Sequence, residues 1–287
     1  MEKYSKYRDQ ATGIAPFQAN KATNSSWVDT IGKVLLAILL YPLSLLSFLV
    51  GLLAIPLVGQ LSGNRVIAAS LRALRIDLSY QGDRKSSVRK NHVLRAEPGD
   101  IIISNFVSPI DPLIYGCLFK CIFLFPNNGK FIRLSMFSAV KQALKLDLAK
   151  GAACDLHLVA TEAKSTGKLI ILFGEGTTSN GKGILPLTNV DFYSLNTLPQ
   201  RVFTSTIRYS PNVVSSPLGG TLLGYLWWLQ TSVYWVIATV SVSKPVELQS
   251  RTKLGVATAM TSTSRLRLVG EDFGIETKRE YSKAIRK

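Results

Sequence analysis

A single carboxylate, Glu175, stands in a loop rich in glycine and in hydroxyl side chains. The loop follows the apolar run 169–173, which is typical of a buried strand, and it continues to Gly181. Glycine lets the backbone approach a ligand closely, and Thr, Ser and Asn side chains supply hydrogen-bond partners. Ligands of open α/β sheets lie beyond the carboxyl ends of the strands, where this loop is expected. The pattern predicts a binding site for a phosphorylated or polyhydroxylated ligand.

The same segment also resembles a nucleotide phosphate loop. Residues 176–183 come within one residue of the pattern G-x-x-x-x-G-K-[ST], because Gly183 stands where the pattern has Ser or Thr. That hydroxyl is the magnesium ligand of the phosphate loop, and glycine has none. The helix that should follow is interrupted by Pro186. The sequence therefore argues against a nucleoside triphosphatase.

A second set of polar residues follows another apolar run. Residues 101–104 are expected to form a short buried strand, and Asn105, Ser108 and Asp111 come after it, with Phe106 among them. An aspartate can act as a general base, whereas a phenylalanine ring cannot accept a proton. We expect Asp111 to face the loop of Glu175 across one cleft.

Together the two segments resemble the glycerolipid (lysophospholipid) acyltransferase superfamily. Residues 173–181 are similar to its F-P-E-G-T-x-x-N-G box, with Gly174 in place of the proline, and residues 105–111 are similar to its N-H-x-S-x-x-D box. The resemblance implies a catalytic box that contains Asn105, Ser108 and Asp111. It also implies that the acceptor's phosphate or polar head is bound by Glu175, Gly176 and Thr177.

The chain departs from the family pattern at Phe106, where the family has a histidine. In the family this histidine takes the proton from the acceptor hydroxyl as it attacks the acyl-CoA thioester, and the aspartate orients the histidine. Neither His92 nor His157 has the required spacing to an aspartate. Three proton acceptors stay open, namely Asp111 directly, Asp111 through a water, or the acceptor's own phosphate. A general base contributes about a hundred- to ten-thousand-fold in rate, while positioning alone contributes roughly 7–11 kcal/mol, so activity is still expected.

The start of the chain extends the resemblance. Residues 1–17 are similar to the N-terminus of fungal lysophosphatidic acid acyltransferases of the endoplasmic reticulum and lipid droplets. The resemblance implies acyl transfer from acyl-CoA, as co-substrate, to a lysophospholipid and above all to lysophosphatidic acid, with no bound cofactor or metal. The alternative is a related protein that keeps the fold to bind lipid or a partner without catalysis. Phe106 favours this alternative, and the intact loop of Glu175 argues against it.

Two arginines are candidate phosphate ligands. Residues 131–133 resemble the family's F-I-x-R element with one residue missing before Arg133, and residues 207–211, which include Arg208, resemble an I-R-Y-P stretch of acyltransferases acting on lysophosphatidylcholine. Arginine suits phosphate because its planar fork makes two parallel charge-assisted hydrogen bonds. Surface arginines of a basic protein are the alternative interpretation.

Two apolar stretches predict contact with a membrane. Residues 34–58 carry no formal charge and exceed the roughly 18 residues that a spanning helix needs, but Pro42 and Gly51 interrupt them. Both flanks are basic, which favours a hairpin anchor with both ends facing the cytosol over a single span. The aromatic stretch 217–242 is either inserted at a membrane interface or is a buried helix followed by a core strand. We expect the protein on the endoplasmic reticulum membrane and on lipid droplets, with its catalytic domain facing the cytosol.

The charge of the chain agrees with these partners. The formal net charge is +16 and the pI is about 9.9, which implies an acidic partner. The acidic partners that account for this positive charge are an anionic membrane, the phosphates of CoA and a lysophosphatidate head group. The sequence lacks zinc-finger, helix-turn-helix and aromatic RNA-binding signatures, so no nucleic acid partner is expected.

The order of apolar runs predicts an α/β fold with a mostly parallel sheet flanked by helices, behind an N-terminal membrane-anchoring segment. Short apolar runs alternate with longer mixed segments such as 134–148 and 152–165. The expected strands are 100–104, 122–125, 168–173, 202–208 and 235–242. The expected divisions are a polar segment at 1–30, the anchor at 31–62, the acyltransferase domain at 63–270, and a basic tail at 271–287 that frays from Lys278 onward.

Overall fold

The computed structural model describes residues 2–20, 75–81, 95–187, 189–231 and 236–286, together with isolated positions between 31 and 65. The predicted anchor at 31–62 therefore lies outside the described residues, apart from those isolated positions. Among the described residues, no helix has both the length and the apolar character needed to cross a bilayer.

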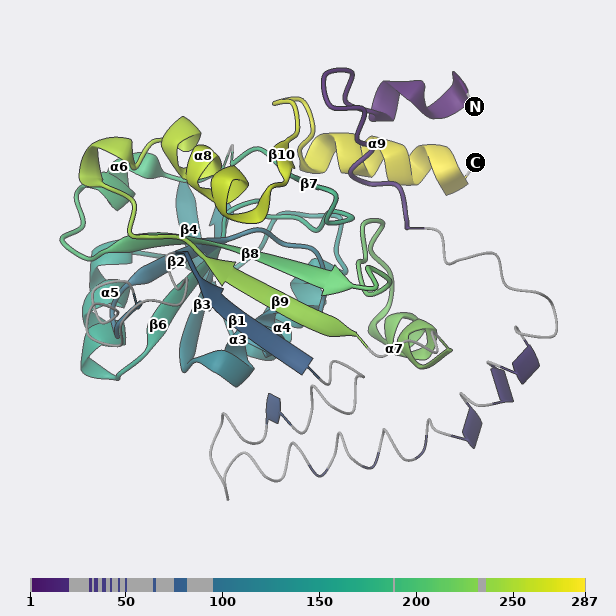
Figure 1. The fold of residues 1–287 in the computed structure, drawn as a ribbon, viewed down its shortest axis with the longest axis horizontal. Coiled ribbons are helices and arrows are strands. Elements are labelled where there is room, and N and C mark those ends of the chain that lie inside the picture. The colour runs from purple at the N-terminus through teal and green to yellow at the C-terminus, as the bar shows by residue number, and fades with distance from the viewer. Residues whose placement is uncertain are drawn as a thin grey trace.

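The described strands form one eight-stranded sheet in the order β1-β9-β8-β2-β6-β3-β4-β5 (Figure 1). The four central strands, β8, β2, β6 and β3, are parallel, and antiparallel pairing joins β9 to β8, β4 to β3 and β5 to β4. Every residue of β2 and β6 is buried, as is typical of parallel strands that are covered on both faces. The strands are β1 (Arg75–Tyr80), β2 (Ile101–Ser104), β3 (Cys121–Asn127), β4 (Lys130–Leu134), β5 (Ala153–Cys154), β6 (Leu169–Phe173), β8 (Val202–Ser210) and β9 (Ile237–Val242).

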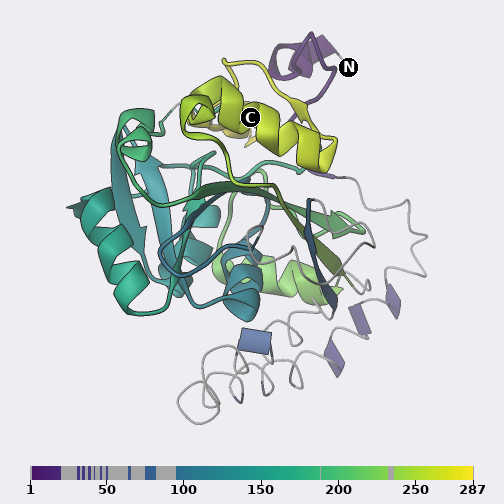
Figure 2. The ribbon, with the colours of Figure 1, turned by 60° about the vertical axis from the view of Figure 1, so that its left-hand side comes forward.

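Helices cover both faces of this sheet (Figures 1 and 2). One apolar core joins the sheet to α3, α4 and α7, and a second core on the other face joins it to α5, α6 and α8. The α/β class and the five strands expected from the sequence are thus confirmed. The helices are α3 (Asp111–Leu118), α4 (Met136–Ala143), α5 (Leu156–Ser165), α6 (Phe192–Asn196), α7 (Leu222–Thr231) and α8 (Lys253–Ser264), with a 3-10 turn η3 (Leu248–Ser250).

The hairpin of β3 and β4 was not predicted from the sequence. Its turn is made by Asn128 and Gly129, whose φ angles are 48° and 74°. Asn-Gly is the dipeptide that favours such turns, because both central residues need positive φ. The same pairing places Arg133 opposite Leu124, near the open end of the hairpin. This dipeptide was therefore the signal that would have predicted the extra strand.

The aromatic stretch 217–242 divides into two elements. Tyr225 and Leu229 of α7 are buried against the first core, whereas Leu223 on the other side of the helix is 72% exposed. Residues 237–242 form β9, which pairs with β1 and β8 inside the sheet. The core strand of the second interpretation is thus present, and α7 keeps one exposed apolar side.

The prediction that the C-terminal tail frays is wrong. Residues Ile275–Arg286 form α9, which lies beside the N-terminal 3-10 helix η1 (Glu2–Tyr7) in both ribbon views (Figures 1 and 2). The rings of Tyr7 and Tyr281 have their centroids 4.9 Å apart, and Lys6 pairs with Glu280 at 3.1 Å. The tail folds because Ile275, Lys278 and Tyr281 recur at helical spacing and are buried against a partner surface that a local view of the sequence does not show. A two-stranded sheet of β7 (Gly183–Ile184) and β10 (Arg267–Leu268) lies in the same region.

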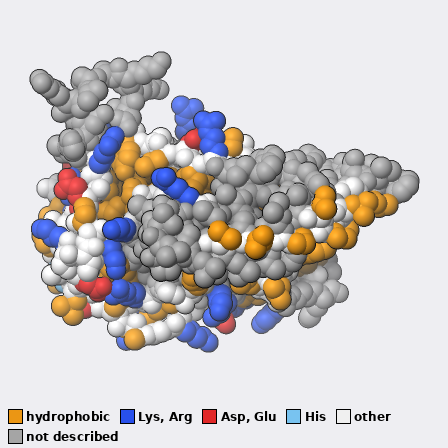
Figure 3. Space-filling view, turned by 90° about the horizontal axis from the view of Figure 1, so that it is seen from below, with side chains coloured by type: hydrophobic (Ala, Val, Ile, Leu, Met, Phe, Trp, Pro, Cys, Tyr) orange, Lys and Arg blue, Asp and Glu red, His pale blue; other side chains and the backbone are white. Residues whose placement is uncertain are grey.

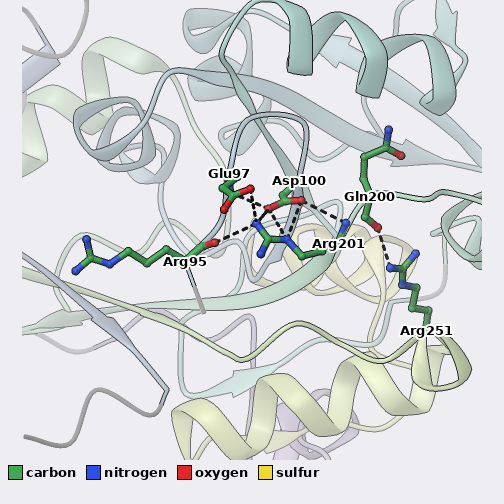
Figure 4. A network of polar contacts seen from close by, with 6 residues as sticks. All are labelled: Arg95, Glu97, Asp100, Gln200, Arg201 and Arg251. Carbon is green, nitrogen blue, oxygen red and sulfur yellow. Dashed lines mark hydrogen bonds and ion pairs between the residues drawn. The ribbon is translucent and has the colours of Figure 1, made fainter. Parts of the chain in front are cut away.

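A polar network ties the amino ends of the central strands together (Figure 4). Asp100, just before β2, accepts hydrogen bonds from the Arg201 guanidinium at 2.6 and 3.1 Å, just before β8. Arg251 donates to the carbonyl oxygen of Gln200 at 2.8 Å. The network fixes the register of β2 and β8 at the end of the sheet opposite to the two predicted boxes.

Candidate active site

The two boxes meet at the carboxyl ends of β2 and β6. These strands are parallel neighbours, and Ser104 is paired with Phe173, so the residues that follow each strand leave the sheet together. The Gly174 amide donates to the Ser104 carbonyl oxygen at 3.1 Å, and the Ser179 amide donates to the Phe106 carbonyl oxygen at 3.0 Å. The predicted meeting of the segments around positions 111 and 175 is therefore found in the structure.

Glu175 joins three segments through its carboxylate. Oε2 accepts the backbone N–H of Phe106 at 3.0 Å, and Oε1 accepts the backbone N–H of Leu185 at 2.9 Å. Burial raises the pKa of Glu175 to about 8, while the two N–H donors and the nearby Lys278 oppose this rise. The side chain therefore acts as a buried bridge between the two boxes and the segment after β7.

Asp111 is the second buried carboxylate, at the first position of α3. Oδ2 accepts the backbone N–H groups of Val107 at 2.7 Å and Ser108 at 3.1 Å, and Oδ1 accepts the hydroxyl of Tyr209. Burial raises the pKa of Asp111 to about 7, against the opposing effect of these three donors. A carboxyl group that titrates near neutral pH is suited to accepting and returning a proton.

Asn105 and Ser108 hold the first box in place. The Asn105 side chain exchanges two hydrogen bonds with the backbone of Ile207, at 2.8 and 3.1 Å, and so extends the pairing of β2 with β8. The Ser108 hydroxyl donates to the Val214 carbonyl oxygen at 2.7 Å and lies 2.9 Å from the Tyr225 hydroxyl. Both side chains are fully buried. These contacts fix the backbone of the first box, so Asn105 and Ser108 position the box rather than the reacting atoms.

Phe106 occupies the place of the family histidine with its ring turned into an aromatic cluster. Its centroid lies 4.6 Å from that of Phe173 and 5.4 Å from that of Phe125, and the side chain is fully buried. Contacts of this kind add to the stability gained from burial. The ring contributes packing, and its backbone N–H supplies the link to Glu175.

Comparison with known proteins shows the family of this chain. A protein of Schizosaccharomyces pombe named "Putative lysophosphatidic acid:oleoyl-CoA acyltransferase" is 30% identical over 246 residues, which cover 77% of this chain and 78% of that protein. This chain belongs to the lysophosphatidic acid acyltransferase family. "Lysophosphatidic acid:oleoyl-CoA acyltransferase 1" of Saccharomyces cerevisiae is also 30% identical, over 196 residues that cover 66% of this acyltransferase chain and 61% of the yeast protein.

No family model matches the chain. The crystal structure of the 1-acyl-sn-glycerophosphate acyltransferase PlsC from Thermotoga maritima aligns with 83% of this chain and 98% of its own, at a TM-score of 0.43 and 11% identity.

In this acyltransferase, Lys278 binds the part of the glycine-rich loop that follows Glu175. Gly176 has a φ of +66°, a conformation in which glycine is favoured, and it turns the chain directly after Glu175. The next residue, Thr177, lies 3.0 Å through its Oγ1 from the Nζ of Lys278, which belongs to α9. Sequence reasoning missed Lys278 because it placed this residue in a fraying tail.

The two candidate arginines lie away from this site. Arg133 alternates along β4 with Ile132 of the first core, so it faces α5, where it makes a two-point ion pair with Glu162 at 2.6 and 2.9 Å. Arg208 alternates along β8 with Tyr209 and donates to the Ser264 carbonyl oxygen at 3.2 Å, at the end of α8. Their predicted contact with substrate stays a prediction, and the geometry places both side chains on the sheet face opposite to Phe106.

A surface cavity adjoins the site of the acyltransferase. Its volume is about 290 Å³, and Tyr225, whose hydroxyl contacts Ser108, lies in its wall. The loop of Glu175 touches the same wall, because the Thr178 hydroxyl donates to the Ser216 carbonyl oxygen at 2.7 Å. Ser108 of the first box and Thr178 of the second thus each contact one residue of the cavity wall.

Proposed function

We propose that this protein transfers an acyl chain from acyl-CoA to lysophosphatidic acid and so forms phosphatidic acid. The observation that carries the proposal is the hydrogen bond between the Phe106 amide and the Glu175 carboxylate, because it joins the two family boxes into one site. The relatives named for this substrate and for oleoyl-CoA support the choice of acceptor and donor. The reaction replaces one thioester by one oxygen ester, and this chemistry does not require a metal.

The reaction needs a place for one proton. The acceptor's hydroxyl oxygen attacks the thioester carbonyl carbon, the carbon–sulfur bond breaks, and CoA leaves as a thiolate. The hydroxyl proton passes to a base and then to the thiolate, so CoA is released as the thiol. Within the two boxes, Asp111 has the chemistry and the pKa for this base.

Tyr209 connects Asp111 to the acceptor in this mechanism. Its hydroxyl donates to Asp111, and its side chain is 6% exposed whereas that of Asp111 is fully buried. Tyr209 passes its own proton to the carboxylate while its oxygen takes the proton of the acceptor hydroxyl. Burial and the charge of Asp111 hold the pKa of Tyr209 well above its usual value, so no free phenolate accumulates between turnovers.

We also propose that the protein works on the surface of the endoplasmic reticulum membrane and of lipid droplets. Apolar side chains at isolated positions are widely exposed, among them Leu39 at 73%, and Leu223 of α7 is 72% exposed. On the face seen in Figure 3, apolar side chains follow one projecting edge, and Lys and Arg side chains are scattered over other parts of the face among further apolar side chains. Apolar groups beside a net positive charge favour an anionic lipid surface.

Flotation with anionic lipid vesicles tests the surface proposal. Leu223→Ser is expected to weaken binding, because it removes an apolar side chain from the exposed side of α7. Leu254→Ser is the matched control, since Leu254 is equally exposed at 72% but belongs to α8 on the other face of the sheet. Equal binding by both variants and the unaltered protein would contradict the proposed contact of α7 with lipid.

An assay of the purified protein tests the activity. Labelled oleoyl-CoA is offered with lysophosphatidic acid, lysophosphatidylcholine and lysophosphatidylethanolamine in separate reactions. Labelled phosphatidic acid is expected to form fastest. Absence of transfer to every acceptor, with the protein folded, would contradict the enzyme assignment and favour the scaffold alternative.

A further inference from the structure

A lysine from the far end of the chain lies inside the loop of Glu175. The Lys278 side chain is 0% exposed, and its Nζ donates to the Thr178 carbonyl oxygen at 2.9 Å and to its Oγ1 at 2.8 Å, besides the bond to Thr177 Oγ1 at 3.0 Å. Lysine is almost never fully buried, because removing its charge from water is costly. Its three donated hydrogen bonds all end on the loop that follows Glu175.

Anchoring of α9 does not explain this lysine. Other contacts already fix the helix: Tyr281 packs on Tyr7, and Arg279 donates to the Leu146 carbonyl oxygen and to Asp147, both at 2.7 Å. An apolar side chain at position 278 would pack between helix and loop without the cost of a buried charge. The ammonium group of Lys278 therefore serves to bind the oxygen atoms of the loop, and α9 does not need it to stay in place.

The N-terminal segment holds the other end of the same loop. The Asn180 amide donates to the Pro16 carbonyl oxygen at 2.8 Å, and its side chain donates to Ala15 and Gln18 at 2.8 and 2.9 Å. The side chain of Asn20 donates back to the Asn180 carbonyl oxygen at 3.1 Å. Segments from both ends of the chain thus hold the same loop. Lys278 binds it at residues 177–178, and residues 15–20 bind it at Asn180.

We infer that Lys278 is a positioning residue for acyl transfer, which acts by holding Thr177 and Thr178 in the conformation that binds the acceptor's phosphate. The inference rests on the proposed function. Thr178 transmits the position of Lys278 to the cavity, because its hydroxyl accepts from Nζ and donates to the Ser216 carbonyl oxygen in the cavity wall. The lysine fixes both the loop and one side of the cavity.

The charge of Lys278 also acts on Glu175. The two groups attract each other, so Lys278 opposes the rise in the pKa of Glu175, and Glu175 opposes the fall in the pKa of Lys278, which burial lowers to about 7. Among the described residues, Asp111 is the other ionisable group that acts on Glu175, and it raises the pKa of that carboxyl group. Loss of the lysine is therefore expected to move the ionisation of Glu175 to higher pH.

The test compares Lys278→Met with Lys283→Met in the acyl-transfer assay. Lys283 is the matched control, because it lies on the same helix with its side chain exposed. For Lys278→Met we expect the KM for lysophosphatidic acid to rise about tenfold, equivalent to roughly 1.4 kcal/mol, with the KM for oleoyl-CoA unchanged. Because the ionised Glu175 carboxylate accepts the Phe106 N–H that joins the two boxes, the acidic limb of the pH profile of kcat/KM should also move to higher pH. Lys283→Met should match the unaltered protein in all three quantities.

The outcomes separate the inference from the proposed function. An inactive unaltered protein would contradict the proposed function itself. An active protein whose Lys278→Met variant keeps both the KM for lysophosphatidic acid and the pH profile would overturn the inference alone, whatever its melting temperature. If Lys278→Met does not fold, Thr177→Ala removes one of its three partners, and an unchanged KM for lysophosphatidic acid in that variant would likewise overturn it.

Discussion

Replacement of Glu175 by glutamine should flatten the dependence of stability on pH. Burial raises the pKa of Glu175 to about 8 from an ordinary value of 4.5. A group whose pKa is raised in the folded state stabilises the fold below its unfolded pKa, and this contribution is lost as the pH rises through the folded pKa. The folded protein should therefore lose stability between pH 4.5 and pH 8, and Glu175→Gln should remove the share that comes from this proton.

The size of this share follows from the same pKa values. The pKa of Glu175 rises from 4.5 in the unfolded chain to about 8 in the folded protein, and each unit of this difference changes the free energy of unfolding by about 1.4 kcal/mol. Between pH 4.5 and pH 8 the free energy of unfolding should therefore fall by roughly 5 kcal/mol through this group. The pKa of Asp111 is also raised, to about 7, so Asp111 causes a further loss of stability with rising pH that remains in the Glu175→Gln variant. Glutamine also accepts only one of the two N–H groups that Glu175 holds, so the variant is expected to be less stable at pH 5 by several kcal/mol.

Urea unfolding at pH 5, 6.5 and 8, followed by tryptophan fluorescence, measures these differences. Glu162→Gln is the control, because Glu162 is exposed and its pKa is lowered by Arg133, so its contribution to stability is lost as the pH falls. The loss of stability caused by Glu175→Gln should be largest at pH 5 and should shrink toward pH 8. Parallel stability curves for Glu175→Gln and the unaltered protein would refute the reasoning that Glu175 is a buried carboxyl with a raised pKa.

Two further predictions concern the site. Phe106→His places a polar ring between Phe125 and Phe173 and should cost about 1–3 kcal/mol of stability, and it should raise kcat only when Tyr209→Phe frees Oδ1 of Asp111 for the imidazole. A higher kcat for Phe106→His alone, in the acyl-transfer assay, would contradict the part given to Tyr209. Arg133→Ala should leave the KM for lysophosphatidic acid unchanged, because its guanidinium is paired with Glu162 on the other face of the sheet; a tenfold rise would contradict the face assigned to it.

The sequence predicted the strands that carry the site because their signal is local. The runs at 101–103 and 169–173 are apolar throughout, and parallel neighbours of this kind bring the residues that follow them to one edge of the sheet. The meeting of the segments that carry Asp111 and Glu175 was predicted from this rule together with the family resemblance. These predictions needed no knowledge of distant contacts.

The parts that the sequence did not predict depend on contacts between distant segments. Lys278 is polar and its helix is amphipathic, so only the contact of α9 with residues 2–20 and with the loop of Glu175 shows that the lysine is buried. The contact of Arg133 and Arg208 with substrate stays a prediction, and the sheet face on which each side chain lies depends on how β4 and β8 pair with strands that are distant in the sequence or were not predicted. Tyr209 lay within a stretch already singled out, yet its partner Asp111 is 98 residues away.

The central claim is that the two boxes form one acyl-transfer site in which Asp111 takes the proton of the acceptor. Single-turnover transfer from oleoyl-CoA to lysophosphatidic acid, by the unaltered protein and by Asp111→Asn, tests it most directly, with circular dichroism to show that both are folded. The account predicts that the rate of the folded variant falls about a hundredfold or more. A folded Asp111→Asn variant that transfers the acyl chain at the rate of the unaltered protein would contradict the account.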